Sequence, residues 1–264
     1  MKEHFIKYKL GYEAYNERRN MSNLYSLFLA QAYQDGWGDY NRSLKLHNFP
    51  KWDYVILTAS NKLQAEGFRK QIEERKNFLP AETKYCVISD RDGKRIGSGG
   101  ATLEVLKYLH EHEESFEGLR VLVIHSGGDS KRVPQYSALG KLFSPVPHKL
   151  PNGRNSTLFD EFMISMSSVP SRIREGMMLL SGDVLLLFNP LQIDYNNIGA
   201  AAISFKEHVE TGKNHGVYLN GDDGNVKCCL QKKTEEVLRE VGATNESDCV
   251  DIDTGALIFS TDMM

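Results

Sequence analysis

Glycines and cations gather behind one apolar, strand-like segment of this sequence, in the stretch HSGGDSKRVP at residues 125–134. Gly127 and Gly128 carry no Cβ, so successive backbone N–H groups are able to converge there on an anion. The guanidinium of Arg132 offers a fork of donors that suits phosphate oxygens, and Lys141 adds a compact positive charge. These residue types predict a loop that binds a polyphosphate, although a turn with two solvated cations is the plainer alternative.

A second candidate is Asp183, which lies in the apolar context MMLLSGDVLLLF. An ionised carboxylate among apolar residues is costly unless a cation compensates its charge. Mg²⁺ suits this position, because it typically takes one or two protein carboxylates together with phosphate oxygens and water. A turn or capping aspartate after Gly182 is the alternative, and the cations at 132 and 141 favour the metal-phosphate interpretation.

Neither of two familiar phosphate-binding patterns fits the first stretch. Lys141 is followed by Leu142 rather than by serine or threonine, and no glycine lies five residues before Gly140, so the P-loop pattern is absent. The dinucleotide-binding pattern G-x-G-x-x-G is missing there as well. The sequence therefore disfavours a P-loop ATPase and a nicotinamide-dependent dehydrogenase.

Three weaker candidates remain. The stretch GSGG at residues 97–100 precedes a predicted helix whose positive amino end would favour an anion, but a tight turn would use the same glycines. Lys232 and Lys233 follow a predicted strand, where a solvated lysine pair is more usual than a ligand contact. His125 is open between a core position at the end of a strand and a ligand contact.

Apolar runs and helical periodicity alternate from residue 52 onward and predict the elements that position these groups. Such alternation needs crossover connections and therefore a mostly parallel sheet, which defines an α/β fold. Ligands bind beyond the carboxyl ends of strands in such sheets, where His125 and Asp183 fall. The expected strands are 54–57, 85–88, 119–124 and 177–180, and the expected helices are one capped by Ser60 with Leu63, Phe68 and Ile72, one with Leu103, Leu106 and Leu109 on one side, and one over 157–167.

The two ends of the chain have simpler patterns. Residues 1–50 read as a helical lead-in, in which Leu24, Leu27, Phe28 and Ala32 fall on one helical face. Later segments predict a strand over 200–205, a hairpin that joins 216–219 to 226–230, and a strand over 255–259. The sequence stops directly after that strand without a closing helix, which leads us to expect a domain truncated at its carboxyl end.

Composition sets the broad class of the protein. With 41% hydrophobic and 25% charged residues, the chain is expected to fold around an ordinary core. The net charge of -3 gives no basic field that would attract nucleic acid or an anionic membrane. The amino terminus has no apolar signal region, which predicts a cytoplasmic protein. The four cysteines show no metal or disulfide spacing and are expected to be reduced thiols on strands (Cys86, Cys228, Cys229 and Cys249).

Three motifs together resemble a known enzyme family. The first stretch, with Gly127, Gly128, Arg132 and Lys141, is similar to the signature of sugar-1-phosphate nucleotidyltransferases. More narrowly, GSGGATL, HSGGDSKRVPQYSALGKLFSPVP and LLSGDVLLLF, in that order, resemble the fucose-1-phosphate guanylyltransferase family, which includes bifunctional enzymes that also carry a fucokinase. The resemblance runs from about Trp52 to the end of the chain, and its central motif is long and specific.

The resemblance implies roles for particular residues. Lys141 would neutralise the reacting phosphate, Arg132 would hold the triphosphate, and Asp183 would bind Mg²⁺. LQKKTEE is similar to the family's sugar-phosphate segment and places Lys232 in that role, with Lys233 where the family usually has proline. DIDTGALIFS resembles the strand beside the sugar pocket. The implied nucleotide-binding residues are Gly97, Ser98, Gly99, Gly100, Ser126, Gly127, Gly128, Asp129 and Ser130, and the implied sugar-phosphate residues are Lys232, Thr254 and Gly255.

The reaction implied by the resemblance is Mg²⁺-dependent transfer of GMP from GTP to L-fucose-1-phosphate, which gives GDP-L-fucose and pyrophosphate. The implied architecture is a Rossmann-like, GT-A-like nucleotidyltransferase core over residues 51–264, with the family's C-terminal β-helix and sugar kinase absent from this chain. Two alternatives stay open: another sugar-1-phosphate nucleotidyltransferase, such as one that uses UTP, and a non-catalytic fragment that binds a nucleotide.

Overall fold

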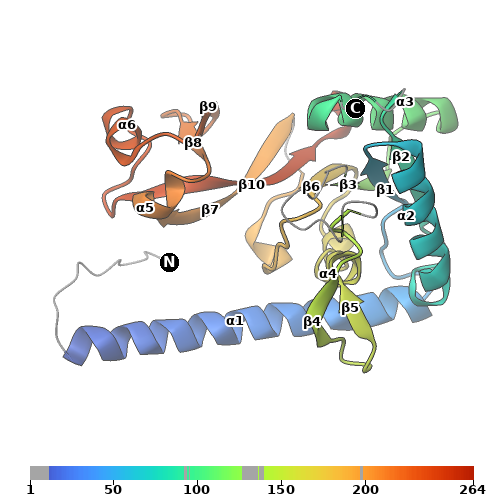
Figure 1. The fold of residues 1–264 in the computed structure, drawn as a ribbon, viewed down its shortest axis with the longest axis horizontal. Helices are drawn as coiled ribbons and strands as arrows, with labels where there is room; N and C mark the ends of the chain where they lie inside the picture. The colour runs from blue at the N-terminus through green and yellow to red at the C-terminus, as the bar shows by residue number, and fades with distance from the viewer. Residues whose placement is uncertain (1–11, 92–93, 95, 127–135, 137–139, 197–198) are drawn as a thin grey trace. The chain divides into compact units, whose positions relative to one another are not determined.

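A computed structural model describes residues 12–91, 94, 96–126, 136, 140–196 and 199–264, with side chains from residue 24 onward (Figure 1). The chain forms two compact units, each built from two separate segments. The larger unit comprises Leu29–Ala201 and Leu257–Met264, and the smaller unit comprises Met1–Phe28 and Ala202–Ala256. The division of the chain at residue 50 stays a prediction.

The larger unit is built on four parallel strands in the order β2-β1-β3-β6. An antiparallel strand completes it, because residues 257–259 of β10 pair with β6. All six residues of β1 are buried, as expected for a parallel strand covered on both faces. The predicted α/β class with a mostly parallel sheet is thus confirmed. The strands are β1 (Tyr54–Ala59), β2 (Lys84–Ser89), β3 (Arg120–His125), β6 (Gly176–Ser181) and β10 (Cys249–Phe259).

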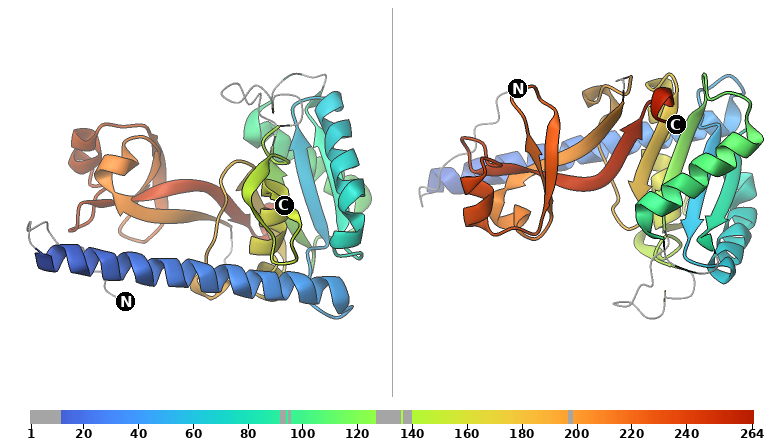
Figure 2. Two further views of the ribbon diagram at one scale, coloured as in Figure 1. Left: turned by 60° about the horizontal axis from the view of Figure 1, so that its bottom comes forward. Right: turned by 90° about the horizontal axis from the view of Figure 1, so that it is seen from above.

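Helices α2 (Lys62–Arg75) and α3 (Gly97–His112) lie against the parallel strands (Figures 1 and 2). Helix α3 inserts Val105 and Leu109 between strand residues such as Ile56, and all three side chains are fully buried. Burying a side chain of this size stabilises the folded state by about 1.5–3 kcal/mol. One sheet face is therefore covered by the helix whose first turn is the GSGG segment.

Two leucines expected on the buried sides of these helices face solvent instead. Leu103 is 67% exposed, because it lies six residues before Leu109 and therefore about 240° away around the helix. Leu63 is 76% exposed, since five residues separate it from the buried Phe68. The expected Ser60 cap of α2 is also wrong: Asn61 accepts the capping hydrogen bond.

A long helix, α1 (Tyr12–Lys45), forms the expected helical amino-terminal segment. Its proposed apolar face is not a core face, because Leu24 and Leu27 are exposed and only Ala32 of that set is buried. Further along, the helix approaches α4 (Leu158–Ser165) so closely that a Cβ on Gly36 would lie 2.9 Å from the carbonyl oxygen of Ile164.

Gly36 and Gly38 provide a matched test of this packing. Alanine favours a helix over glycine by about 1 kcal/mol, so Gly38→Ala, which meets nothing within 4 Å, should raise the free energy of unfolding by about that amount. Gly36→Ala should lower it instead, because the new Cβ would clash with the backbone of α4. Urea denaturation of both variants checks this, and equal stabilisation by the two would contradict the close contact.

The smaller unit contains the expected hairpin, formed by the antiparallel strands β8 and β9, and part of β10 pairs antiparallel with β8. Strand β10 starts at Cys249, six residues before the predicted start, because Val250 and Ile252 join the small core of this unit. The elements are β7 (Ala200–His208), α5 (Val209–Gly212), β8 (Gly216–Asn220), β9 (Val226–Gln231) and α6 (Glu235–Glu240).

The remaining elements are short. A two-stranded antiparallel sheet of β4 (Pro145–Lys149) and β5 (Asn155–Thr157) was not expected from the sequence. Described 3₁₀ turns include Lys76–Phe78, Val169–Ser171, Pro190–Gln192 and Thr261–Met263. In the part of the chain that the structure describes, no helix is both long and apolar enough to span a membrane.

Candidate functional site at the carboxyl ends of the parallel strands

The candidate site lies where the parallel strands of the larger unit end. Thr58 near the end of β1 pairs with His125 at the end of β3, and His125 pairs with Ser181 at the end of β6. Ligands of open α/β sheets bind at this edge. The sequence prediction that His125 and Asp183 mark neighbouring strand ends is therefore confirmed.

Lys141 and Asp183 meet at this edge. The Nζ atom of Lys141 lies 2.8 Å from a carboxylate oxygen of Asp183, and the hydroxyl of Ser181 donates to the other oxygen at 2.9 Å. The hydrogen bond from Lys141 lowers the pKa of Asp183, against an opposing effect of burial, and Ser181 lowers it further. Both side chains stay accessible, since Asp183 is 47% exposed and Lys141 is 32% exposed. An ionised carboxylate and an ammonium group thus share one open position.

Two glycines allow this close arrangement. Gly182 donates its N–H to the carbonyl of His125 at 2.9 Å, and a Cβ there would lie 2.9 Å from the same oxygen. Gly140 has a φ of +69°, a conformation that residues with a side chain rarely adopt. A glycine, which has no Cβ, therefore directly precedes each of Lys141 and Asp183 and allows the backbone conformation there.

His125 connects three elements at the same edge. Its Nδ1 lies 3.2 Å from the hydroxyl of Thr58, and its Nε2 lies 3.0 Å from the hydroxyl of Thr102 in α3. Thr102 in turn donates to the carbonyl of Ser98 at 3.0 Å. The sequence left His125 undecided and did not point to either threonine, because these residues come from separate elements and no local motif joins them.

Burial lowers the pKa of His125 from 6.5 to about 4. Between these values the unfolded chain binds more protons than the folded chain, so stability rises with pH across this window. The contribution is fully present above pH 6.5 and is lost as the pH falls towards 4.

We expect the unfolding free energy to fall by about 2 kcal/mol more in the unmodified protein than in His125→Gln between about pH 7 and pH 4.5. The contributions of the other titrating groups to the pH dependence cancel in this comparison, because both proteins carry those groups. Chemical denaturation at each pH measures the difference, and parallel pH profiles for the two proteins would contradict a buried neutral imidazole.

The predicted nucleotide-binding residues before and after His125 are only partly described. Ser126 is buried, and its hydroxyl donates to the carbonyl of Thr58 at 2.7 Å, so it anchors the start of the loop. The GSGG segment, residues 97–100, forms the exposed first turn of α3 rather than a turn before it, and its N-cap residue, Ile96, makes no side-chain capping hydrogen bond. Gly127, Gly128, Asp129, Ser130 and Arg132 lie outside the described residues.

The predicted sugar-phosphate residues lie in the smaller unit. Lys232 is exposed and has a φ of 48°, which is unusual for a residue with a side chain. The hydroxyl of Thr254 donates to the carbonyl of Ile203, so it is already engaged. Gly255 donates its N–H to Asp253 at 2.7 Å, a carboxylate that the sequence had not singled out.

Asp183 is suited to bind a metal ion only when other groups, such as nucleotide phosphates, complete the coordination. Among the described residues, no group of three or more histidine, cysteine, aspartate or glutamate side chains is arranged to hold a metal ion. A single ionised, half-exposed carboxylate is nevertheless the donor that Mg²⁺ takes when nucleotide phosphates and water complete its coordination. The donor set at Asp183 therefore fits such an ion.

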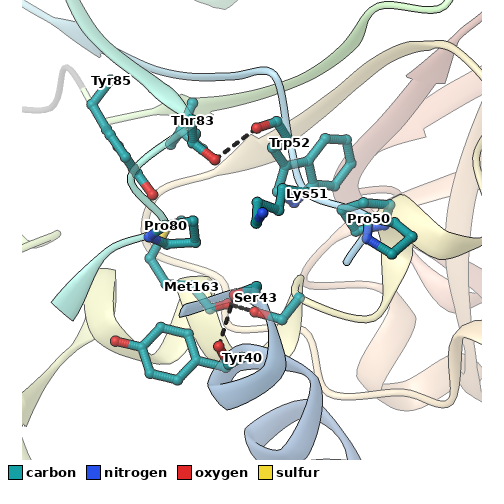
Figure 3. Close-up of a pocket in the computed structure, with 12 residues that line it drawn as sticks. Tyr40, Ser43, Pro50, Lys51, Trp52, Pro80, Thr83, Tyr85 and Met163 are labelled. Carbon is teal, nitrogen blue, oxygen red and sulfur yellow. Dashed lines mark hydrogen bonds between the residues drawn. The ribbon is translucent and has the colours of Figure 1, made fainter. Parts of the chain in front are cut away.

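A separate hollow lies at the opposite edge of the sheet, where the parallel strands begin (Figure 3). Its volume is about 310 Å³ when the adjoining space that is open to solvent is included. Tyr40, Trp52 and Tyr85 contribute to its lining. Two of its hydroxyl groups are engaged internally, since Thr83 donates to the carbonyl of Trp52 and Ser43 to that of Tyr40, each at 2.7 Å. Of the candidate residues that the structure describes, none lines this hollow.

Comparison with known proteins identifies similar sequences. The profile of the Fucose pyrophosphorylase domain matches residues 113–264. The bifunctional fucokinase/GDP-fucose pyrophosphorylase of Arabidopsis thaliana is 29% identical over 245 residues, which cover 79% of this chain and 23% of that protein. The fucose-1-phosphate guanylyltransferase of Mus musculus is 32% identical over 183 residues, which cover 67% of this chain and 30% of that protein. The chain thus spans less than a third of either relative.

Proposed function

This chain belongs to the fucose pyrophosphorylase family, and on that premise we propose that it transfers GMP from GTP to L-fucose-1-phosphate, with GDP-L-fucose and pyrophosphate as products. The observation that carries the proposal is the Lys141–Asp183 pair at the carboxyl edge of the parallel sheet. It supplies a positive and a negative group, 2.8 Å apart, at the place where such sheets bind ligands. We also propose that the mostly parallel core is of the Rossmann-like, GT-A-like type.

The proposed reaction joins two anions. A phosphate oxygen of L-fucose-1-phosphate attacks the α-phosphorus of GTP, a new phosphorus–oxygen bond forms, and the bond to the β-phosphate oxygen breaks as pyrophosphate leaves. The sugar phosphate is already ionised at neutral pH, so no side-chain nucleophile or strong base is required. Catalysis then depends on alignment of the reactants and on compensation of negative charge.

Each candidate residue has a role in this scheme. Lys141, now paired with Asp183, would contact a phosphate oxygen when the nucleotide is bound and offset its charge. Asp183 would hold Mg²⁺, which supplies Lewis-acid compensation at the phosphate oxygens when bound. Arg132 and the glycines at 127 and 128 would hold the triphosphate, and Lys232, Thr254 and Gly255 would bind the sugar phosphate.

Release of pyrophosphate tests the proposal directly. The chain is incubated with Mg²⁺, L-fucose-1-phosphate and each of GTP, UTP, ATP and CTP, and binding of each nucleotide is followed in parallel by thermal shift. We expect pyrophosphate with GTP and none without the sugar phosphate. A preference for UTP would contradict the guanylyl assignment, and nucleotide binding without any release would favour the non-catalytic alternative.

A further inference from the structure

The hydrogen bonds around His125 define one tautomer of its ring. A hydroxyl has a single proton, and Thr102 gives its proton to the carbonyl of Ser98. The oxygen of Thr102 must therefore accept from the ring, which places the proton on Nε2 of His125. Nδ1 is then an acceptor, and the hydroxyl of Thr58 donates to it. The chain of donors runs in one direction, from Thr58 through His125 and Thr102 to Ser98.

This chain of hydrogen bonds joins the end of β1, the end of β3 and the first turn of α3. Thr102 lies in the second turn of the helix and is 8% exposed, so its hydroxyl exchanges these partners for water only at a cost. Near the end of β1, the backbone carbonyl of Thr58 also accepts a hydrogen bond from the hydroxyl of Ser126. His125 and Ser126 thus tie the GSGG turn and the start of the following loop to a single position on β1.

The first turn of α3 consists mostly of glycine. Ile96 precedes it without a capping hydrogen bond, and a Cβ on Gly97 or Gly99 would meet nothing within 4 Å. Glycine turns are mobile unless something holds them, because glycine loses more conformational freedom on folding than other residues. The hydrogen bond from Thr102 to the carbonyl of Ser98 adds a side-chain restraint to the backbone hydrogen bonds of this turn.

We propose that His125 is a positioning residue that, as the Nε2–H tautomer, fixes the GSGG turn of α3 against the ends of β1 and β3. It thereby sets the affinity of the site for the nucleoside triphosphate. His125 acts through Thr102 and does not touch the reacting atoms. The affinity part rests on the function proposed above, whereas the tautomer and the fixed turn stand independently of it.

The test uses four variants of the whole chain. Thr102→Val keeps the branched shape and removes the hydroxyl, and Thr102→Ser restores the hydroxyl in the conservative form. Thr83→Val is the matched control, because it removes another buried threonine hydroxyl, bonded to the carbonyl of Trp52 at the opposite edge of the same sheet (Figure 3). His125→Gln identifies the His125 signals in the imidazole ¹⁵N spectrum.

We expect the unmodified protein and Thr102→Ser to show protonated Nε2 at His125, and Thr102→Val to lose this preference. Amide hydrogen exchange at residues 101–104, whose N–H groups face the carbonyls of the GSGG turn, should be about tenfold faster in Thr102→Val, as expected for the loss of one or two hydrogen bonds. The KM for GTP should rise by about tenfold in the same variant, with kcat and the KM for L-fucose-1-phosphate within about threefold of the unmodified values. Thr83→Val should lose stability without these changes.

A protonated Nδ1, or unchanged exchange in Thr102→Val, would overturn the positioning role. An unchanged KM for GTP in that variant would overturn its link to affinity. If the unmodified chain binds no nucleotide, the proposed function fails and the affinity part with it. The tautomer and exchange results then still decide whether His125 holds the turn.

Discussion

Replacement of Lys141 by methionine is expected to lower kcat/KM for GDP-fucose formation by about 30- to 1,000-fold, equivalent to about 2–4 kcal/mol of lost transition-state stabilisation. Methionine keeps the length and most of the apolar stem of lysine but removes the charge that faces Asp183. The effect should be large because both reactants of the proposed reaction are anionic and the charge would act where a phosphate reacts. Steady-state kinetics with GTP and L-fucose-1-phosphate measure it.

Lys213→Met is the matched control for this variant. Lys213 forms an ion pair with Glu235 at the same distance of 2.8 Å and with similar exposure, but it lies in the smaller unit. An exposed pair of this kind contributes at most about 1 kcal/mol to stability, so both variants should unfold near the unmodified protein. Activity of Lys141→Met within threefold of the control would contradict the role of Lys141.

Asp183→Asn should have an effect of comparable size, with kcat/KM lower by about 100- to 1,000-fold. Asparagine keeps the shape and the oxygen that accepts from Ser181 but removes the negative charge that a Mg²⁺ ion needs. The concentration of Mg²⁺ that gives half-maximal activity should also rise. Activity assays at a series of Mg²⁺ concentrations measure both changes.

Glu235→Gln, from the same control pair, removes an equivalent carboxylate elsewhere. It should leave the Mg²⁺ dependence unchanged. An Asp183→Asn variant whose Mg²⁺ dependence matches that of Glu235→Gln would show that Asp183 does not bind the ion. Loss of activity with an unchanged Mg²⁺ dependence would instead assign Asp183 to the placement of Lys141.

The parallel core could be predicted from the sequence because its strands are covered on both faces. Such strands appear as unbroken apolar runs, and Val121–Ile124 is fully buried as that pattern requires. The small sheet of β4 and β5 could not be predicted, since β4 contains two prolines and β5 is three residues long. The exposure of Leu24 and Leu27 could not be predicted either, because periodicity identifies an apolar helix face but does not show whether another element covers it.

The candidate site was predictable in part for a related reason. His125 and Asp183 lie at or just after strand ends, and parallel strands bring such ends to one edge whatever lies between them in the chain. The role of His125 was not predictable, because it depends on hydroxyl groups of Thr58 and Thr102 that no spacing connects. The hydrogen-bond partners of Thr58 and Thr102 can be identified only once the fold has placed these residues beside His125.

The last strand has a consequence for synthesis on the ribosome. Strand β6 ends at Ser181, but residues 257–259, which cover its free side, are translated only after residues 182–256. At about 5–20 residues per second this interval lasts roughly 4–15 seconds. During that time the nascent sheet presents an unpaired, apolar strand edge of the kind that promotes association between chains. We therefore expect newly made chains to be most prone to association before residues 257–259 pair with β6.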